Sequence, residues 1–245
     1  MHMALAQAHY LLFGLVLLCV TPASMRVKEH AVTPFEFIYC RHGESSSNLL
    51  KKGHLVAALS KYGPRSIGFD SPLTETGERQ ALQTHLHLAS THPNLRTYRV
   101  MTSALRRAKH TADIICRTGL RSRKSRPYDE VDERLNERTF MEHLGGSEGG
   151  AHFEERIRSF MSDMLQRRPD ERPQVVVGHS LWFRVMIQMG KPSYDQNKGA
   201  SGSIEDAGTY INNAECRTVT VNESASSKAG FEAAESPVID PSFPV

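Results

Sequence analysis

The chain has 245 residues, 39% of them hydrophobic, which fits one sizeable core rather than several domains. Its formal net charge of +3 at pH 7 is only mildly basic, so the sequence does not require a nucleic acid as a partner. The cysteines, at positions 19, 40, 116 and 216, form no Cys-x-x-Cys pair and no cluster with metal-ligand spacing, so we expect neither a structural zinc site nor a disulfide framework.

An apolar segment, residues 1–25, precedes the main part of the chain. Its run "YLLFGLVLLCV" (residues 10–20), taken with the residues before it, is close to the shortest length that spans a membrane. Arg26 and Lys28 follow directly, which favours an anchor that keeps its C-terminal side in the cytosol. We therefore expect membrane association through residues 4–21, with a cytosolic catalytic domain.

Two other interpretations of this segment stay open. A secretory signal peptide cleaved after Ala23 fits the apolar run, although no Lys or Arg precedes that run. Cleavage would also leave three of the cysteines, an odd number for a secreted domain. In the last interpretation, the segment is an extension upstream of a start at Met25, and the location of the protein stays open with it.

Strands and helices are predicted to alternate along the rest of the chain. Short apolar runs rich in β-branched residues predict strands at residues 35–40, 98–103, 127–132 and 174–180. Helical spacing and helix stop signals predict helices at residues 75–90, 104–119, 151–168 and 181–190. In the first of these helices, Thr74 is the expected N-cap, and Leu82, Leu86 and Ala89 recur at helical spacing as an apolar face.

This alternation predicts a three-layer α/β/α sandwich, in which a mostly parallel sheet is covered by helices on both faces. Residues 208–222 are predicted to close the sheet with a pair of strands. One domain over residues 30–223 is therefore sufficient. Residues 224–245 are rich in Ser, Ala, Glu and Pro without periodicity, so we expect a disordered tail.

Cationic side chains and imidazoles stand at the ends of three predicted strands. Arg41 and His42 end the first strand, Arg107 lies one helical turn beyond the second, and His179 follows the fourth. Because the carboxyl ends of parallel strands meet at one edge of a sheet, we expect these side chains to converge in one pocket. Such a pocket would bind an anion.

Four sequence motifs occur in order at these strand ends: "RHGE" at residues 41–44, "SALRRAKHTA" at 103–112, "LNER" at 135–138 and "GHS" at 178–180. With these motifs the chain resembles the histidine phosphatase superfamily, in the branch related to cofactor-dependent phosphoglycerate mutase, from about residue 35 to residue 222. The resemblance implies a phosphoglycerate mutase-like fold. It also implies a phosphatase that uses neither a metal nor a cofactor and that hydrolyses phosphate monoesters through a phosphohistidine intermediate.

The resemblance assigns catalytic roles that suit each residue type. His42 would be the nucleophile, because a neutral imidazole can attack phosphorus without first losing a proton. Arg41 and Arg107 would bind the phosphoryl oxygens with planar, bidentate donors, which removes the need for a metal. His179 would complete this phosphate clamp as a further donor.

Glu137 would be the general acid and later the general base. Phosphate and carboxylate charge around it should raise its pKa enough for proton donation. Asp132 and Glu133 are nearby competitors for this role.

The remaining residues carried by the motifs would contact the substrate. By the same resemblance, Glu44, Ser45, Asn48 and Ser180 are the expected substrate-binding residues. Between the two arginines of the second motif, the spacing selects Arg107 over Arg106, which we expect on the exposed side.

The chain departs from the family pattern in two places. Tyr39 stands where the family usually has an aliphatic residue, and we interpret it as a tolerated core substitution. The segment between Glu137 and His179, of about forty residues, is shorter than in the mutases, which carry an insertion with extra basic residues there. This shortness favours hydrolysis.

Two rival functions stay open: phosphoglycerate mutase-type phosphoryl transfer, and a non-catalytic, membrane-anchored phosphate-binding module. The expected substrate is a phosphorylated small molecule or a phosphoprotein. Residues 50–71 and 145–155 are predicted to form the rim that selects it, but the sequence does not reveal their arrangement.

Overall fold

The computed structural model describes residues 34–51, 60, 70–116, 128–137, 146–192, 210–225, 227 and 229–237. All of them belong to one compact unit, residues 33–245. The apolar segment of residues 1–25, for which we expect an anchor, a signal peptide or an extension, lies outside the described residues. Among the residues that are described, no helix combines the length and the apolar character needed to cross a membrane.

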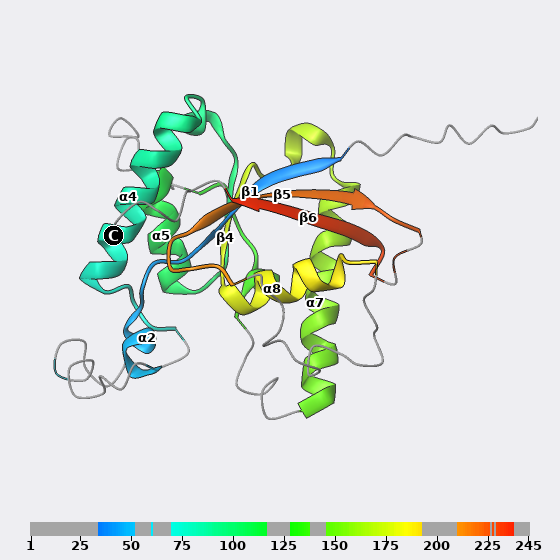
Figure 1. Ribbon diagram of the computed structural model, residues 1–245, viewed down its shortest axis with the longest axis horizontal. Helices are drawn as coiled ribbons and strands as arrows, with labels where there is room; N and C mark the ends of the chain where they lie inside the picture. Colours follow the sequence, from blue (N-terminus) through cyan, green and yellow to red (C-terminus); the bar gives the residue numbers. More distant parts are fainter. Residues whose placement is uncertain are drawn as a thin grey trace, which may run out of the picture. The chain divides into compact units, whose positions relative to one another are not determined.

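A six-stranded sheet with the order β3-β2-β4-β1-β5-β6 forms the centre of the described structure (Figure 1). The strands are β1 (Phe35–Arg41), β2 (Val100–Thr102), β3 (Glu130–Val131), β4 (Val175–Gly178), β5 (Cys216–Glu223) and β6 (Phe231–Pro237). The first four strands in the sheet order pair in parallel, whereas β5 and β6 are antiparallel additions at one edge. The predicted mostly parallel sheet is therefore confirmed.

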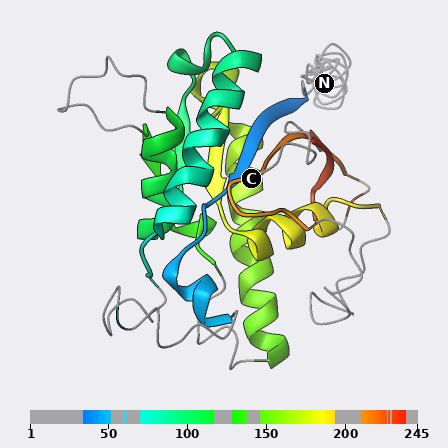
Figure 2. The same cartoon turned by 60° about the vertical axis from the view of Figure 1, so that its left-hand side comes forward.

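Helices cover both faces of this sheet, as a three-layer sandwich requires. They are α2 (Ser46–Lys51), α4 (Glu75–Thr91), α5 (Arg106–Cys116), α7 (Gly146–Gln166) and α8 (Ser180–Met189). Helices α4 and α5 lie on one face, and α7 and α8 lie on the other (Figure 2). The predicted α/β/α fold class is confirmed.

Strand β1 shows how the two cores form. Successive side chains of a strand point to opposite faces of the sheet. Phe37 and Tyr39 accordingly pack in the cluster of α7 and α8, whereas Ile38 and Cys40 pack in the cluster of α4 and α5. Burial of each large apolar side chain contributes roughly 1.5–3 kcal/mol, so the strand is fixed from both sides.

The helix predicted at residues 75–90 is confirmed as α4, but the apolar residues whose spacing indicated it do not face inward. Leu82 and Leu86 are 51% and 62% exposed, and Ala89 is exposed as well. The buried residues of the helix are instead Gly77, Ala81, Thr84 and Leu88. The Thr84 hydroxyl donates a 2.6 Å hydrogen bond to the carbonyl oxygen of Ala214, which fixes the rotation of the helix about its axis. The predicted N-cap is confirmed, because Thr74 Oγ1 accepts a hydrogen bond from the Gly77 amide.

Helix α7 starts at Gly146, earlier than the predicted start at residue 151. Gly149 and Gly150, which suggested a loop, lie inside the helix and are buried. Packing therefore outweighs the low helix propensity of glycine, which costs about 1 kcal/mol per residue relative to alanine.

The C-terminal predictions need two corrections. Only β5, Cys216–Glu223, forms within the predicted closing pair, and its antiparallel partner β6 lies at Phe231–Pro237. The predicted disordered tail from residue 224 is therefore wrong for this strand. An edge strand has one neighbour, so it needs few apolar residues, and here the buried Phe231 is enough to anchor it.

We expected no disulfide framework, and the structure adds a single disulfide that the sequence did not predict. Cys40 on β1 and Cys216 on β5 form a disulfide, with their Cα atoms 4.1 Å apart. The two residues are direct partners in the antiparallel register, but 176 positions separate them in the sequence. Sequence spacing therefore gave no sign of the bond. Cys116 is buried and takes no part in it.

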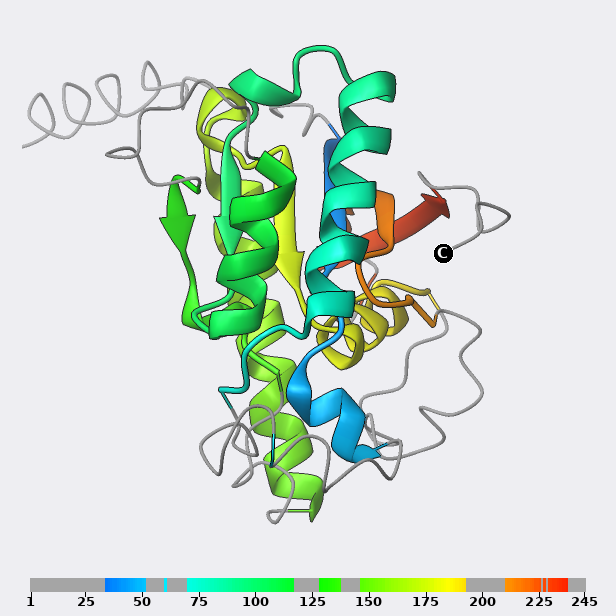
Figure 3. The ribbon, with the colours of Figure 1, turned by 90° about the vertical axis from the view of Figure 1, so that its left-hand side faces the viewer.

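The parallel strands point their carboxyl ends toward the end of the molecule where α2 lies (Figure 3). Arg41 ends β1, Thr102 ends β2 and Gly178 ends β4, so the segments that follow these strands start side by side. This edge of the sheet positions the candidate site.

Candidate active site

His42 is the central side chain of the site and lies directly after β1. Its Nδ1 lies 2.6 Å from the carbonyl oxygen of Gly43, and its Nε2 accepts a 3.1 Å hydrogen bond from Arg107 Nε. A carbonyl oxygen can only accept a hydrogen bond, so Nδ1 carries the ring proton. This leaves the lone pair of Nε2 directed away from the backbone, toward the Arg107 guanidinium.

Two buried guanidinium groups lie beside this imidazole. Arg107 lies in the first turn of α5, whereas Arg106 is exposed, as the spacing predicted. Burial lowers the pKa of Arg107, although a guanidinium in a protein keeps its proton. Arg41 donates from Nη1 to the Ile211 carbonyl oxygen at 2.8 Å and to the Tyr210 hydroxyl at 3.1 Å.

His179 is completely buried at the N-terminus of α8. Its ring meets that of His42 edge-on, with 5.0 Å between the ring centroids. Its Nε2 lies 2.8 Å from Ser103 Oγ, whose proton goes to Asn136 Oδ1, so Nε2 is the donor of this pair. Burial, followed by the charges of Arg107 and other nearby cations, lowers the pKa of His179 well below 6.5, so the imidazole is neutral near pH 7.

Tyr39 has a role that the sequence did not suggest. Its hydroxyl accepts a 2.7 Å hydrogen bond from the His179 amide and donates a 3.0 Å hydrogen bond to the His179 carbonyl oxygen. A Cβ atom on Gly178 would lie 2.2 Å from this hydroxyl, so Gly178 leaves room for it. Tyr39 is therefore not only a tolerated core residue, because it holds the backbone of His179 in place.

Glu137 follows a short 3₁₀ turn, Glu133–Leu135, and lies beside the two imidazoles. Its Oε2 is 3.8 Å from His179 Nδ1, and its side chain is 25% exposed.

The competing carboxylate of Asp132 instead forms a 2.7 Å ion pair with Arg134. Arg156 of α7 donates to the carbonyl oxygens of Glu133, Arg134 and Asn136 and so holds this segment against the site.

The expected substrate-binding residues divide into two pairs. Asn48 and Ser180 line the cavity in front of His42. Glu44 and Ser45 are buried and are not among the residues that line it, and their contact with substrate stays a prediction. Their polar groups serve the loop itself: Ser45 donates from its amide to Asn48 Oδ1 at 2.9 Å, and Glu44 Oε1 accepts from the Thr74 hydroxyl at 3.0 Å.

The cavity has a volume of about 420 Å³, and the predicted residues Arg41, His42, Asn48, Arg107, Glu137 and Ser180 line it. Five further residues, which the sequence motifs did not indicate, also line it: Ser47, Leu181, Arg184, Tyr210 and Asn213. Arg184 lies one helical turn beyond Ser180, so helical spacing could have identified it. Tyr210 and Asn213 precede β5, and only the antiparallel pairing of β5 with β1 brings them to this edge.

The site is better suited to bind an anion than a metal ion. Ligand atoms of His42, Glu137 and His179 lie within 4.8 Å of one another, a spacing that could hold a cation. The guanidinium groups of Arg41 and Arg107 line the same cavity, and their charge repels a cation and attracts an anion. The electrostatics therefore favour a phosphoryl group.

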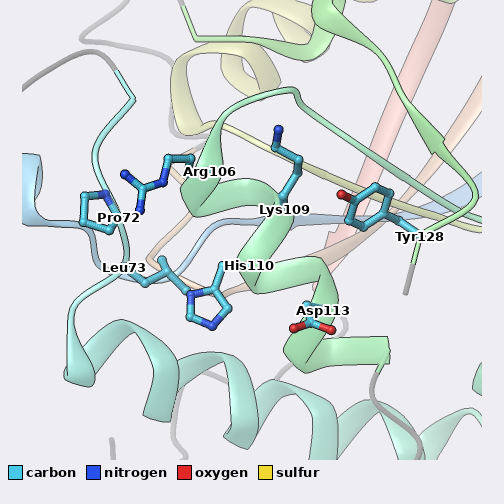
Figure 4. A pocket seen from close by; sticks show the side chains of 7 residues that line it. All are labelled: Pro72, Leu73, Arg106, Lys109, His110, Asp113 and Tyr128. Carbon is cyan, nitrogen blue, oxygen red and sulfur yellow. The ribbon is translucent and has the colours of Figure 1, made fainter. Parts of the chain in front are cut away.

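A second cavity, of about 470 Å³, lies along the outer side of α5 (Figure 4). Its lining includes Arg106, Lys109, His110 and Asp113 from this helix, together with Pro72, Leu73 and Tyr128. It contains none of the predicted catalytic residues.

Fold and site together define an α/β protein with a cationic, histidine-containing pocket at the carboxyl ends of its parallel strands. Residues 37–146 match the family model of the histidine phosphatase superfamily, branch 1. The matched range includes His42, Arg107 and Glu137.

Two solved structures illustrate the fold. A mycobacterial glucosyl-3-phosphoglycerate phosphatase in complex with VO3 has a TM-score of 0.50 and 17% sequence identity, over 82% of this chain and 97% of that chain. A phosphoglycerate mutase from Bacillus anthracis has a TM-score of 0.52 and 16% identity, over 84% of this chain and 93% of that chain. The chain matches no curated protein sequence.

Proposed function

We propose that the chain is a metal-independent phosphatase that hydrolyses phosphate monoesters through a phosphohistidine on His42. The superfamily and the solved relatives support an enzyme of the phosphatase or mutase type. The arrangement of the side chains around His42 supports the particular reaction proposed here.

The hydrogen bond from His42 Nδ1 to the Gly43 carbonyl oxygen, 2.6 Å long, is the observation that carries this proposal. It fixes the tautomer in which Nε2 has the lone pair, so the nucleophile needs no separate base. Nε2 attacks phosphorus, the bond between phosphorus and the leaving oxygen breaks, and Arg41 and Arg107 neutralise the equatorial oxygens.

Glu137 is the proton donor of this mechanism. It gives its proton to the leaving oxygen, and its carboxylate then accepts a proton from the water that attacks phosphohistidine. Phosphate leaves, and both Glu137 and His42 return to their starting protonation states. Glu137 Oε2 lies 3.8 Å from His179 Nδ1, so this carboxyl group is next to the proposed phosphoryl site.

His179 is the further hydrogen-bond donor to the phosphoryl group in this mechanism. In the unliganded site it is neutral, and its Nδ1 makes no hydrogen bond to any residue within the described ranges. A phosphoryl group with about two negative charges would favour a proton on this nitrogen and so turn it into a donor.

Hydrolysis is favoured over mutase transfer by the short segment between Glu137 and His179. Among substrates, a phosphorylated small molecule suits a cavity of about 420 Å³, which is within the usual range for small ligands. The predicted rim at residues 50–71 lies mostly outside the described residues, so the finer choice of substrate stays open.

The test is hydrolysis of para-nitrophenyl phosphate and of an alkyl phosphate by the 245-residue chain in the presence of EDTA. We expect His42→Ala to lower kcat by about 10³-fold or more, because the nucleophile is lost. Glu137→Gln should lower kcat by about 10²–10⁴-fold on the alkyl phosphate and by less on para-nitrophenyl phosphate, whose leaving group needs little protonation. His152→Ala, an exposed histidine of α7, is the matched control.

Alkaline quenching and mass spectrometry should find the phosphoryl group on His42. Turnover that requires 2,3-bisphosphoglycerate and moves phosphate within phosphoglycerate would support the mutase alternative instead. Phosphate binding without any turnover would support the non-catalytic binding module.

A further inference from the structure

The catalytic cavity has a second group of polar side chains that the proposed mechanism does not use. Ser180 and Arg184 come from α8, and Asn213 comes from the segment before β5. All three line the same cavity of about 420 Å³ as His42. We call Ser180, Arg184 and Asn213 the α8 subsite.

Buried polar atoms of this subsite lack partners. Ser180 Oγ, Arg184 Nε and Asn213 Oδ1 are inaccessible to solvent, and none of them makes a hydrogen bond to a residue that the structure describes. An unsatisfied buried donor or acceptor costs about 1–3 kcal/mol, and an unpaired buried charge costs more. The three side chains line the cavity, so a bound ligand that reorients them would supply the missing partners.

Arg184 differs from the arginines on the outside of the domain. Arg134, Arg167 and Arg217 each form ion pairs with carboxylates at 2.7 to 3.1 Å. For Arg184, no carboxylate of the described ranges lies within ion-pairing distance. Its guanidinium thus faces a cavity in the same way as the phosphate-binding arginines do.

The position of Arg184 separates it from the phosphoryl clamp. Helix α8 starts at Ser180, next to His179, and rises 1.5 Å per residue, so Arg184 lies about 6 Å further along the helix. The backbone of Arg184 therefore lies one turn beyond the Ser180 end of the cavity, which fits contact with a separate group of the same small molecule.

We propose that the α8 subsite binds a second anionic group of the substrate, and that Arg184 selects for phosphate monoesters that carry one. Arg184 would form a charge-assisted hydrogen bond to that anion. Ser180 would contribute a neutral donor, and Asn213 Oδ1, which can only accept, would take a hydrogen bond from a hydroxyl group of the same substrate. The inference rests on the proposed phosphate-binding site around His42, but it does not require that the bound ester is hydrolysed.

Binding to the full chain carrying His42→Asn, which stops turnover, tests the subsite by calorimetry. Glycerol 3-phosphate and 3-phosphoglycerate share a skeleton, but only the second has a carboxylate. Fructose 6-phosphate and fructose 1,6-bisphosphate form the corresponding pair for a second phosphate. In at least one pair, we expect the compound with the second anionic group to bind about tenfold or more tightly than its matched ester.

Arg184→Met should bring this ratio close to one, and Arg184→Lys should retain part of it, because lysine keeps the charge but loses the planar fork. Asn213→Asp, which puts a carboxylate into the subsite, should also lower the ratio. Arg79→Met, which removes an exposed arginine of α4, should leave the ratio unchanged.

An affinity ratio near one in both pairs would overturn the subsite, even if no Arg184 variant folds. An affinity ratio that Arg184→Met leaves unchanged would overturn it as well. Hydrolysis of para-nitrophenyl phosphate by the unmodified chain is measured separately. Its absence would refute the proposed phosphatase, whereas its presence with a ratio near one would refute the subsite alone.

Discussion

A single hydroxyl group, that of Tyr39, satisfies both backbone groups of His179. Tyr39→Phe would leave the buried His179 amide without a partner, whereas the His179 carbonyl oxygen would keep its hydrogen bond from the Phe183 amide. We therefore expect the free energy of unfolding to fall by about 1–3 kcal/mol. We also expect kcat to fall, because His179 would no longer be held at the end of β4. Urea unfolding and phosphatase assays measure the two effects.

Tyr98→Phe is the matched control, because the Tyr98 hydroxyl lies 3.4 Å from a His92 ring nitrogen, in a part of the fold that contributes no residue to the catalytic cavity. If Tyr39→Phe left both stability and kcat at the values of this control, the hydroxyl would be only a tolerated core group.

The buried imidazole of His179 should make stability depend on pH. Burial lowers its pKa in the folded chain, so below about pH 6.5 the unfolded chain binds a proton that the folded chain does not. Stability is therefore fully present above the unfolded pKa and is lost as the pH falls below it. Between pH 7.5 and pH 5.5 we expect a loss of about 1.4 kcal/mol from this residue.

Urea unfolding of the wild-type chain and of His179→Gln at both pH values measures this loss. The variant should lose about 1.4 kcal/mol less than the wild type over the interval. Equal losses in the two chains would show that His179 does not resist protonation in the folded state.

At the scale of elements, close contact between two backbone segments positions the nucleophile. A Cβ atom on Gly77, in the first turn of α4, would lie 2.0 Å from the carbonyl oxygen of Glu44, which follows His42 and Gly43. Alanine is the better helix former by about 1 kcal/mol, but here it would push backbone against backbone. We therefore expect Gly77→Ala to lower the free energy of unfolding by about 1–3 kcal/mol.

The same substitution should lower kcat, because the displaced segment carries His42. Thermal unfolding and the phosphatase assay test both effects, with Gln83→Ala on the exposed face of α4 as the control. A stabilised and fully active Gly77→Ala chain would show that helix propensity, not close approach, decides this position.

At the scale of the whole molecule, the Cys40–Cys216 disulfide joins the first strand of the domain to the fifth. Because it closes a loop with a sequence separation of 176, its reduction should lower the free energy of unfolding by about 2–4 kcal/mol. Urea unfolding with and without reductant measures this, and a Cys40→Ala/Cys216→Ala double variant should not respond to reductant.

Alkylation of the unfolded, unreduced chain followed by peptide mapping provides an independent check. It should label neither Cys40 nor Cys216 until reductant is added. Labelling of Cys40 without reductant would contradict the disulfide.

Much of the fold and of the candidate site could be predicted from local sequence. Apolar strands that alternate with helices dictate a parallel sheet covered on both faces, and the carboxyl ends of such strands must share one edge. Arg41, His42 and His179 stand directly beside these strand ends, and Arg107 and Glu137 follow closely. Local sequence was therefore sufficient to predict that these five side chains meet, because the chain between each strand and its polar residue is short.

Tertiary structure alone decided the features that depend on contacts between distant segments. The disulfide and the positions of Tyr210 and Asn213 follow from the antiparallel pairing of β5 with β1, which sequence spacing does not encode. Likewise, the rotation of α4 that exposes Leu82 depends on a hydrogen bond from Thr84 to the segment before β5. Periodicity records which residues share a face of an element, whereas the partner of that face is decided only when the whole chain packs.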